Sequence, residues 1–178
     1  IATQIGFDFE AGRLDESTHP FCSGTHCRDV RLTTRFHENN VNDAIGSTMH
    51  EAGHGIYEQG LLYEHVGTQM GQAVSLGIHE SQSRMWENQV GRSEAFWKWC
   101  YPKMSEFFGD ATSSLSFDDV YGGANFVKPD FIRVEADEAT YNMHIMIRFE
   151  LERLLMNGDL AVKDLPEAWN QRYQEYLG

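Results

Sequence analysis

The chain has 178 residues, with 27 acidic side chains against 14 basic ones and a formal net charge of −13. This length fits one domain with a core that needs no disulfide staples. The acidic excess argues against nucleic acid and against an anionic membrane surface as partners, because both attract lysine and arginine. No apolar run is long enough to span a membrane. Three cysteines are too few for a disulfide framework, which favours the cytoplasm.

The pattern of apolar and capping residues predicts a mainly α-helical fold with a small β element. Glycine and proline punctuate residues 1–28, which we therefore expect to form loop. Residues 29–36 alternate and are rich in β-branched side chains, which predicts a strand at a sheet edge, with Val30, Leu32 and Thr34 on one side.

Helices are predicted along the rest of the chain. The first follows cap residues at 39–43, runs to Gln59 and ends at Gly60. A second covers residues 77–90, and a third starts at Ser93 and reaches Phe108, with Pro102 expected to kink or break it. Three more are expected at 116–121, at 137–157 and at 163–177, with an extended stretch at 126–136.

The most informative motif is His50-Glu51-Ala52-Gly53-His54 in the first long helix. Histidines at i and i+4 lie on one helix face, so two imidazole nitrogens can meet one zinc ion. Glu51 can then take a proton from an attacking water and pass it to the leaving amine. Gly53 is costly inside a helix and indicates either a close backbone approach or tight helix packing.

A catalytic zinc usually takes three protein ligands. Glu80 lies 26 residues after His54 and is the favoured third ligand, with the adjacent His79 as its rival. Adjacent helical side chains point about 100° apart, so only one of them can face the metal. If Glu80 is the ligand, we expect His79 to contact a ligand or the substrate. A second, weaker metal candidate is the histidine and cysteine cluster of residues 19–27.

Five motifs, in this order, resemble the M32 metallocarboxypeptidases, the thermostable carboxypeptidase family of HExxH zinc peptidases. The matching segments are HPF at 19–21, DVRLT at 29–33, HEAGH at 50–54, HESQSRMWEN at 79–88 and IRVEAD at 132–137. The resemblance implies that His50, His54 and Glu80 bind the metal and that Glu51 is the general base and acid. It also implies a zinc-dependent carboxypeptidase of broad specificity, with Co²⁺ or another divalent ion as alternatives to Zn²⁺.

The resemblance also implies substrate contacts. The strand at residues 29–36 would hold an extended peptide, with Asp29 and Arg31 supporting the site; the alternative is a buried ion pair. His19 is expected in a loop near the site. Arg133 would bind the terminal carboxylate of the peptide through its forked donors, and the alternative is a salt bridge to Glu135 or Asp137.

Family members are much longer than this chain. We therefore expect residues 1–178 to be a single catalytic segment without the family's N-terminal helical half and C-terminal end. Two functions follow: the core of a carboxypeptidase that releases single C-terminal residues, or an incomplete metal-binding fragment with little or no turnover. A third is a short peptidase with an open groove and endopeptidase character. Uncovered apolar surface would favour a homo-oligomer, with a dimer expected.

Overall fold

The computed structural model describes all 178 residues, and the fold is mainly α-helical with one three-stranded sheet, as predicted. Two compact units divide the chain, residues 1–121 and residues 122–178. No helix is both long enough and apolar enough to cross a lipid bilayer.

The expectation of loop for residues 1–28 is wrong. This segment contains helix α1 (Ala2–Ile5) and strands β1 (Gly12–Glu16) and β2 (Phe21–His26), which precede β3 (Asp29–Thr34). β1 and β2 are short and mostly exposed, so neither shows a clear alternation of apolar residues. Both strands are stabilised by hydrogen-bonded pairing with β3, and their own sequences do not indicate that pairing.

β3 is the central strand, not an edge strand. The sheet order is β1-β3-β2, with β1 parallel and β2 antiparallel to β3. The predicted alternation is confirmed, since Val30, Leu32 and Thr34 are all fully buried. Val30 and Leu32 join Phe7 and Ala52 in one apolar cluster between the sheet and helix α2 (Val41–Gln59).

Polar contacts fix α2 against the end of β3. Asn40 caps the helix by accepting a hydrogen bond from the backbone N–H of Asp43, and Gly60 ends it, as predicted. Arg35 donates two hydrogen bonds to the Asp43 carboxylate, at 2.9 and 3.0 Å. The hydroxyl oxygens of Thr34 and Ser47 lie 2.8 Å apart, which satisfies a buried group.

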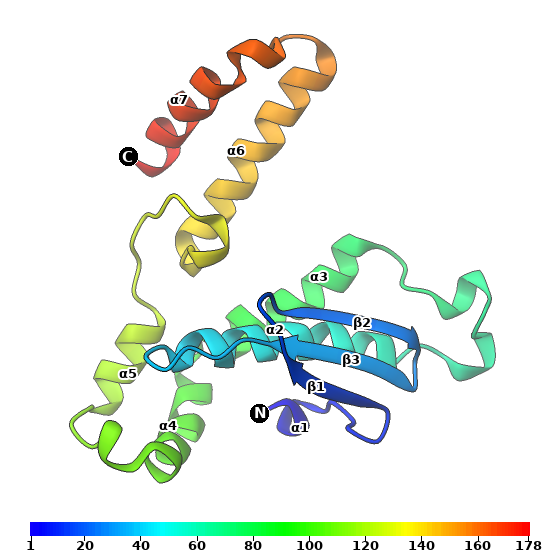
Figure 1. Ribbon diagram of the computed structural model, residues 1–178, viewed down its shortest axis with the longest axis vertical. Helices are drawn as coiled ribbons and strands as arrows, with labels where there is room; N and C mark the ends of the chain where they lie inside the picture. The colour runs from blue at the N-terminus through cyan, green and yellow to red at the C-terminus, as the bar shows by residue number, and fades with distance from the viewer. The chain divides into compact units, whose positions relative to one another are not determined.

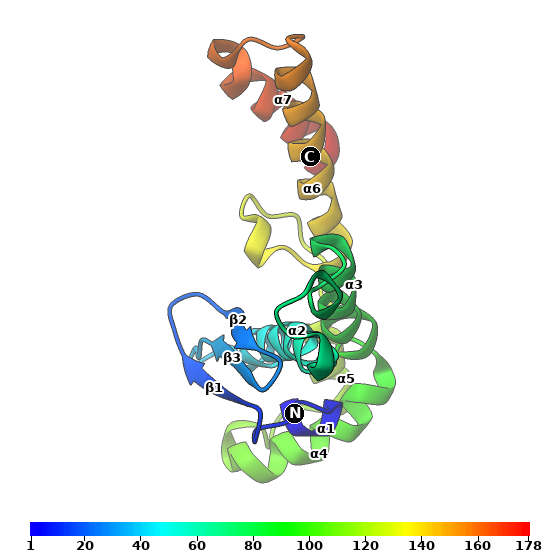
Figure 2. The ribbon, with the colours of Figure 1, turned by 90° about the vertical axis from the view of Figure 1, so that its right-hand side faces the viewer.

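Helix α2 lies between the sheet and helix α3 (Leu76–Arg84), as Figure 2 shows. A π-helical turn (Met85–Val90) follows α3. The close backbone approach expected at Gly53 is present, since a Cβ added there would lie 2.7 Å from the Cα of Ser83. Gln82 also donates a hydrogen bond of 3.0 Å to the carbonyl of Gly53. The two helices are therefore in direct backbone contact beside the HEAGH motif.

The next two helices along the chain follow the predicted positions with one difference, at Pro102. Helix α4 (Glu94–Phe108) begins after the Ser93 cap and continues through Pro102 without a break. Helix α5 (Phe117–Ala124) begins at the Ser116 hydroxyl, which accepts a hydrogen bond from the backbone N–H of Asp119.

The C-terminal unit is a helical hairpin of α6 (Glu138–Asn157) and α7 (Leu165–Leu177), which run side by side in Figure 1. Asp137 caps α6 by accepting hydrogen bonds from the backbone N–H groups of Ala139 and Thr140, and Gly158 ends it with a left-handed backbone. Ile147, Leu151 and Tyr173 form the core of the hairpin.

Candidate metal centre

His50 and His54 stand one turn apart on α2, on the face toward α3. Their Nε2 atoms lie 3.2 Å from each other, and their rings meet edge to face with centroids 4.8 Å apart. Both side chains are more than four-fifths buried. The i, i+4 spacing therefore places two ring nitrogens at one point, next to the helix that follows.

Glu80 reaches this point from α3. Its carboxylate oxygens lie 3.2 Å from Nε2 of His54 and 3.7 Å from Nε2 of His50. These three side chains are the only group of three or more histidine, cysteine or acidic residues in the chain whose ligand atoms converge, all within 4.8 Å of one another. The histidine and cysteine cluster of residues 19–27 forms no such group.

The spacing of the three ligand atoms fits a metal ion. Two atoms that bind one ion tetrahedrally, with bonds of about 2.0–2.1 Å, lie about 3.3 Å apart. Two of the three separations, at 3.2 Å, match this value, and the third, from Glu80 to His50, is longer at 3.7 Å. Imidazole with carboxylate is a donor set suited to zinc. The hydrogen bond with His54, helped by the charge of His50 and opposed by burial, lowers the pKa of Glu80 to about 2. The carboxylate is thus in its ligating, ionised form.

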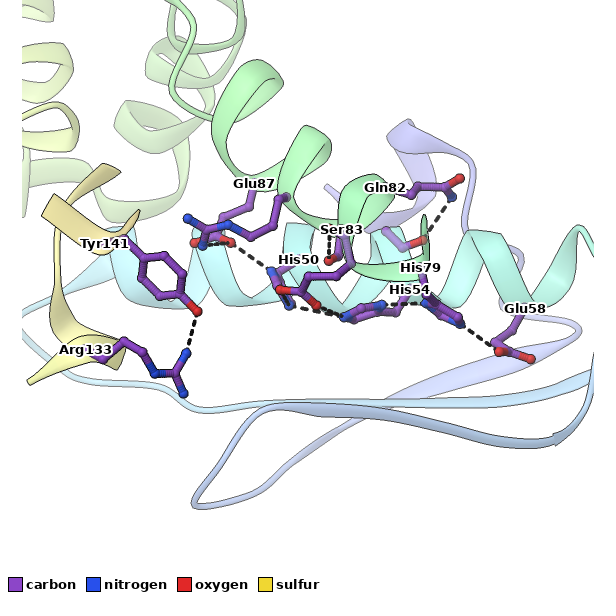
Figure 3. A network of polar contacts seen from close by, with 12 residues as sticks. His50, His54, Glu58, His79, Gln82, Ser83, Glu87, Arg133 and Tyr141 are labelled. Atoms are coloured by element: carbon purple, nitrogen blue, oxygen red, sulfur yellow. Dashed lines mark hydrogen bonds and ion pairs between the residues drawn. The ribbon is translucent and has the colours of Figure 1, made fainter. Parts of the chain in front are cut away.

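His79 lies on the other side of His54. Its Nδ1 is 2.6 Å from Nδ1 of His54, and its Nε2 is 2.7 Å from a carboxylate oxygen of Glu58. The ring stacks on Tyr57, with centroids 4.4 Å apart. Figure 3 shows His54, His79 and Glu58 in a row along α2. Glu80 and not His79 therefore belongs to the converging group.

Glu87 is a site residue that sequence reasoning missed. Its Oε2 lies 2.8 Å from Nδ1 of His50, and Arg84 donates to the same oxygen at 2.8 Å. The signal was present in the sequence, because Glu87 follows Glu80 by seven residues, two helical turns, and therefore shares its face.

Glu51 is buried on α2, between the two histidines in sequence, with 7% of its surface exposed. Burial is the largest influence on its carboxyl group and raises its pKa above the ordinary value for glutamate. The charges of His50 and His54 oppose this shift, and the charge of Glu80 adds to it. A carboxylate with a raised pKa is a better proton acceptor near neutral pH.

His19 lies between β1 and β2. Its backbone carbonyl accepts hydrogen bonds from the hydroxyls of Ser17 and Thr33, at 2.5 and 3.3 Å. Its ring is close enough for its charge to lower the pKa of Glu51, which is consistent with a loop beside the site.

The alternative reading of Asp29 and Arg31, a buried ion pair, is wrong as to burial. The two form a bidentate ion pair at 2.9 and 3.1 Å, but their side chains are 43% and 60% exposed. They point away from the buried side of β3, which Val30 and Leu32 occupy. Such an exposed pair contributes little to stability.

Arg133 lies in the C-terminal unit. Its guanidinium donates a 2.5 Å hydrogen bond to the hydroxyl of Tyr141, drawn in Figure 3, and lies 5.5 Å from the centre of that ring. The carboxylate of Asp137 is occupied by the cap of α6.

A small sheet and an HExxH helix whose two histidines meet the Glu80 carboxylate are the arrangement expected of a metallopeptidase. The chain matches the carboxypeptidase Taq (M32) metallopeptidase family along residues 1–178. It is 53% identical to thermostable carboxypeptidase 1 of Thermus thermophilus over 178 residues, which are all of this chain and 35% of the relative. It is 47% identical to carboxypeptidase 1 of Bacillus subtilis over 175 residues, 98% of this chain and 35% of the relative.

Solved structures agree with the sequence relatives. An M32 carboxypeptidase from Deinococcus radiodurans R1 has a TM-score of 0.96 at 46% identity, covering 99% of this chain and 36% of that protein. The chain belongs to the M32 metallopeptidase family. It spans about a third of the length of the relatives it matches.

Proposed function

We propose that residues 1–178 are the catalytic segment of a zinc-dependent carboxypeptidase that removes single C-terminal residues from peptides with broad specificity. The observation that carries the proposal is the convergence of His50, His54 and Glu80 beside the buried Glu51. In this assignment His50, His54 and Glu80 bind Zn²⁺, or Co²⁺ or another divalent ion. Glu51 moves the proton.

The proposed chemistry divides between the ion and Glu51. A bound divalent ion would act as a Lewis acid on the scissile carbonyl and make water a stronger acid. Glu51 would take a proton from the attacking water through its carboxylate oxygen and then donate it to the departing amine nitrogen. The raised pKa of Glu51 supports this exchange, because the group then holds a proton more readily between the two steps.

The peptide would lie extended along an edge of the sheet. The sequence suggested that β3 holds the peptide by main-chain pairing. This is excluded, because β1 and β2 occupy both sides of β3. The outer strands each leave one edge for an additional strand. Asp29, Arg31, His79 and His19 stay proposed contacts or supports, and Arg133 stays the proposed binder of the terminal carboxylate.

Cytoplasmic location and a homodimer are further parts of this proposal. All three cysteines are unpaired, which fits a reducing compartment. Large apolar side chains such as Phe107, Phe131 and Leu76 are at least 80% exposed, which supports self-association or packing against other parts of a longer protein. Light scattering of the purified chain measures the oligomeric state.

The test compares the purified chain with Glu51→Gln after loading with Zn²⁺. We expect both to bind one equivalent of metal, and only the unmodified chain to release the terminal residue of a blocked dipeptide. Metal binding without turnover would support the alternative, an incomplete metal-binding fragment. Cleavage of a peptide with an amidated C-terminus would indicate endopeptidase character. A chain that binds no metal would contradict the site itself.

A further inference from the structure

Both proposed histidine ligands use their second ring nitrogen. Nε2 of each ring points to the convergence point shared with Glu80. Nδ1 of His50 contacts Glu87 at 2.8 Å, and Nδ1 of His54 contacts His79 at 2.6 Å. The five side chains from Glu87 to Glu58 form one row along α2 in Figure 3.

The protons of this row can be assigned by balancing donors and acceptors. A neutral imidazole carries one N–H, so a ring that offers Nε2 to a cation carries its proton on Nδ1. His50 then donates to Glu87. His54 donates to Nδ1 of His79, which must accept, so His79 carries its proton on Nε2 and donates to Glu58 at 2.7 Å. Each of these three contacts then has one donor and one acceptor, whereas the contact between the Nε2 atoms of His50 and His54 has two acceptors, which a cation would join.

The two ends of the row are held by neighbouring side chains. Arg84 donates to the same Glu87 oxygen that faces His50, and Glu87 itself belongs to the π-helical turn, so the contact holds its carboxylate in place. At the other end, His79 stacks on Tyr57 and is 13% exposed. Neither support is a flexible surface group, so each can determine the orientation of the ring it contacts.

We propose that Glu87 and the His79–Glu58 pair are positioning residues, which fix the tautomer and the orientation of His50 and His54 so that both Nε2 atoms face the metal. This inference rests on the proposed function. The two supports are unequal. Glu87 accepts directly through a charged oxygen, whereas Glu58 acts on His54 only through the neutral ring of His79, and charge-assisted hydrogen bonds are the stronger kind.

The experiment measures the affinity of the chain for Zn²⁺ by competition with a chelator. We expect Glu87→Gln to weaken binding by roughly 10–100-fold, the usual effect of removing such a support, and Glu58→Gln to weaken it less. Glu94→Gln is the matched control, because Glu94 is an exposed residue paired with Lys98 on α4, and it should bind zinc as the unmodified chain does.

His79 allows a rescue experiment. His79→Phe removes the acceptor of the His54 proton and should weaken zinc binding. His79→Asn places an oxygen near the position of Nδ1 and should restore most of the affinity, which a merely space-filling role would not explain. The visible spectrum of the Co²⁺-loaded chain should change with His79→Phe and return toward the original with His79→Asn.

The outcomes separate this inference from the function on which it rests. If the unmodified chain binds no metal, or if His50→Ala binds it undiminished, the metal site is wrong and the supports fail with it. If His50→Ala abolishes binding while Glu87→Gln and His79→Phe keep the affinity and Co²⁺ spectrum of the unmodified chain, only the positioning role is overturned. Long-range nitrogen NMR of zinc-loaded protein gives a second reading, with the ring proton expected on Nδ1 of both ligands and on Nε2 of His79.

Discussion

The long helices α2 and α6, one in each unit, both carry histidines whose side chains are largely buried, and the surroundings of those rings differ. On α2, carboxylates face His50, and they raise its pKa even though burial, the largest single effect, lowers it. On α6, the fully buried His144 contacts the hydroxyl of Tyr173 at 3.0 Å and has Arg148 as its charged neighbour. Burial first and then Arg148 lower its pKa.

The difference shows that a histidine in a helix becomes a candidate ligand through the charges around it, not through burial or helix position. His144 has a hydroxyl and a cation beside it, and it fills the core of a helical hairpin, as its apolar neighbours in sequence indicate. His50 and His54 have two acidic residues within reach, Glu80 and Glu87, and their Nε2 atoms converge. Four variants test this contrast.

Replacing the third proposed ligand should break the contrast most strongly. We expect Glu80→Ala to lower zinc affinity by more than the roughly 100-fold upper range for a supporting residue, because one of three ligands is lost. Competition with a chelator measures the change. Glu64→Ala, which removes an exposed carboxylate, is the control. Undiminished affinity in Glu80→Ala would show that another group is the third ligand.

Gly53→Ala tests whether Glu80 and Glu87 reach the histidines of α2 because the backbones of α2 and α3 are in contact. The added Cβ in Gly53→Ala would collide with the backbone of Ser83, and such overpacking costs about 1–3 kcal/mol. Gly46→Ala changes the same helix where a Cβ meets nothing within 4 Å, so it should gain up to about 1 kcal/mol. Urea unfolding measures both, and equal effects of the two changes would contradict the close contact.

Tyr173→Phe tests the other side of the contrast. The change removes the hydroxyl that contacts the ring of His144. Arg148, which donates a 3.1 Å hydrogen bond to that hydroxyl, loses this acceptor. Leaving a buried polar group unpaired costs about 1–3 kcal/mol. Amide hydrogen exchange in α6 and α7 should quicken while zinc affinity stays unchanged. A loss of zinc affinity would show that the two histidine environments are not independent.

The smallest expected effect is at the start of α6. Burial raises the pKa of the Asp137 carboxyl, but hydrogen bonds from backbone N–H groups, those of Thr140 and Lys128 first, outweigh it, so the pKa is lowered. The resulting stabilisation is present above the ordinary pKa of aspartate and is lost as the pH falls through the lowered value. Asp137→Ala should cost about 1 kcal/mol at neutral pH.

The control for the cap is Asp137→Asn. An asparagine keeps a capping oxygen but does not titrate, so exchange in the first turn of α6 should lose its dependence on acid pH while the helix remains capped. If the unmodified chain shows no such dependence between neutral and acid pH, the carboxylate does not stabilise the helix as inferred.

The elements with local signals could be predicted from the sequence. Asn40 and Gly60 mark the ends of α2, and Asp137 and Gly158 mark the ends of α6. The alternation of buried residues in β3 is visible in its sequence. β1 and β2 could not be predicted because partner strands stabilise them and their own side chains are mostly exposed. For the same reason the central place of β3 depends on neighbours that its sequence does not specify.

The candidate site was predictable where one helix carries it. The spacing of HEAGH brings His50 and His54 together, and Glu80 follows from the need for a third ligand on a neighbouring helix. Glu87 was missed because it contacts Nδ1 of His50, whereas the HExxH spacing specifies only the nitrogens that face the metal. The exposure of the Asp29–Arg31 pair depends on which face of β3 is covered, and tertiary packing decides that.

The short connection between β3 and α2 has a consequence for the order of folding. Residues 35–40 join the two elements, and the Arg35–Asp43 ion pair ties residues only eight apart in the chain. Closing so short a loop loses little chain entropy, whereas bringing Glu80 to α2 requires the longer segment of residues 60–75 to close. Local contacts also form fastest. We therefore expect the strand and the histidine-bearing helix to assemble early, with the Glu80 carboxylate joining them later.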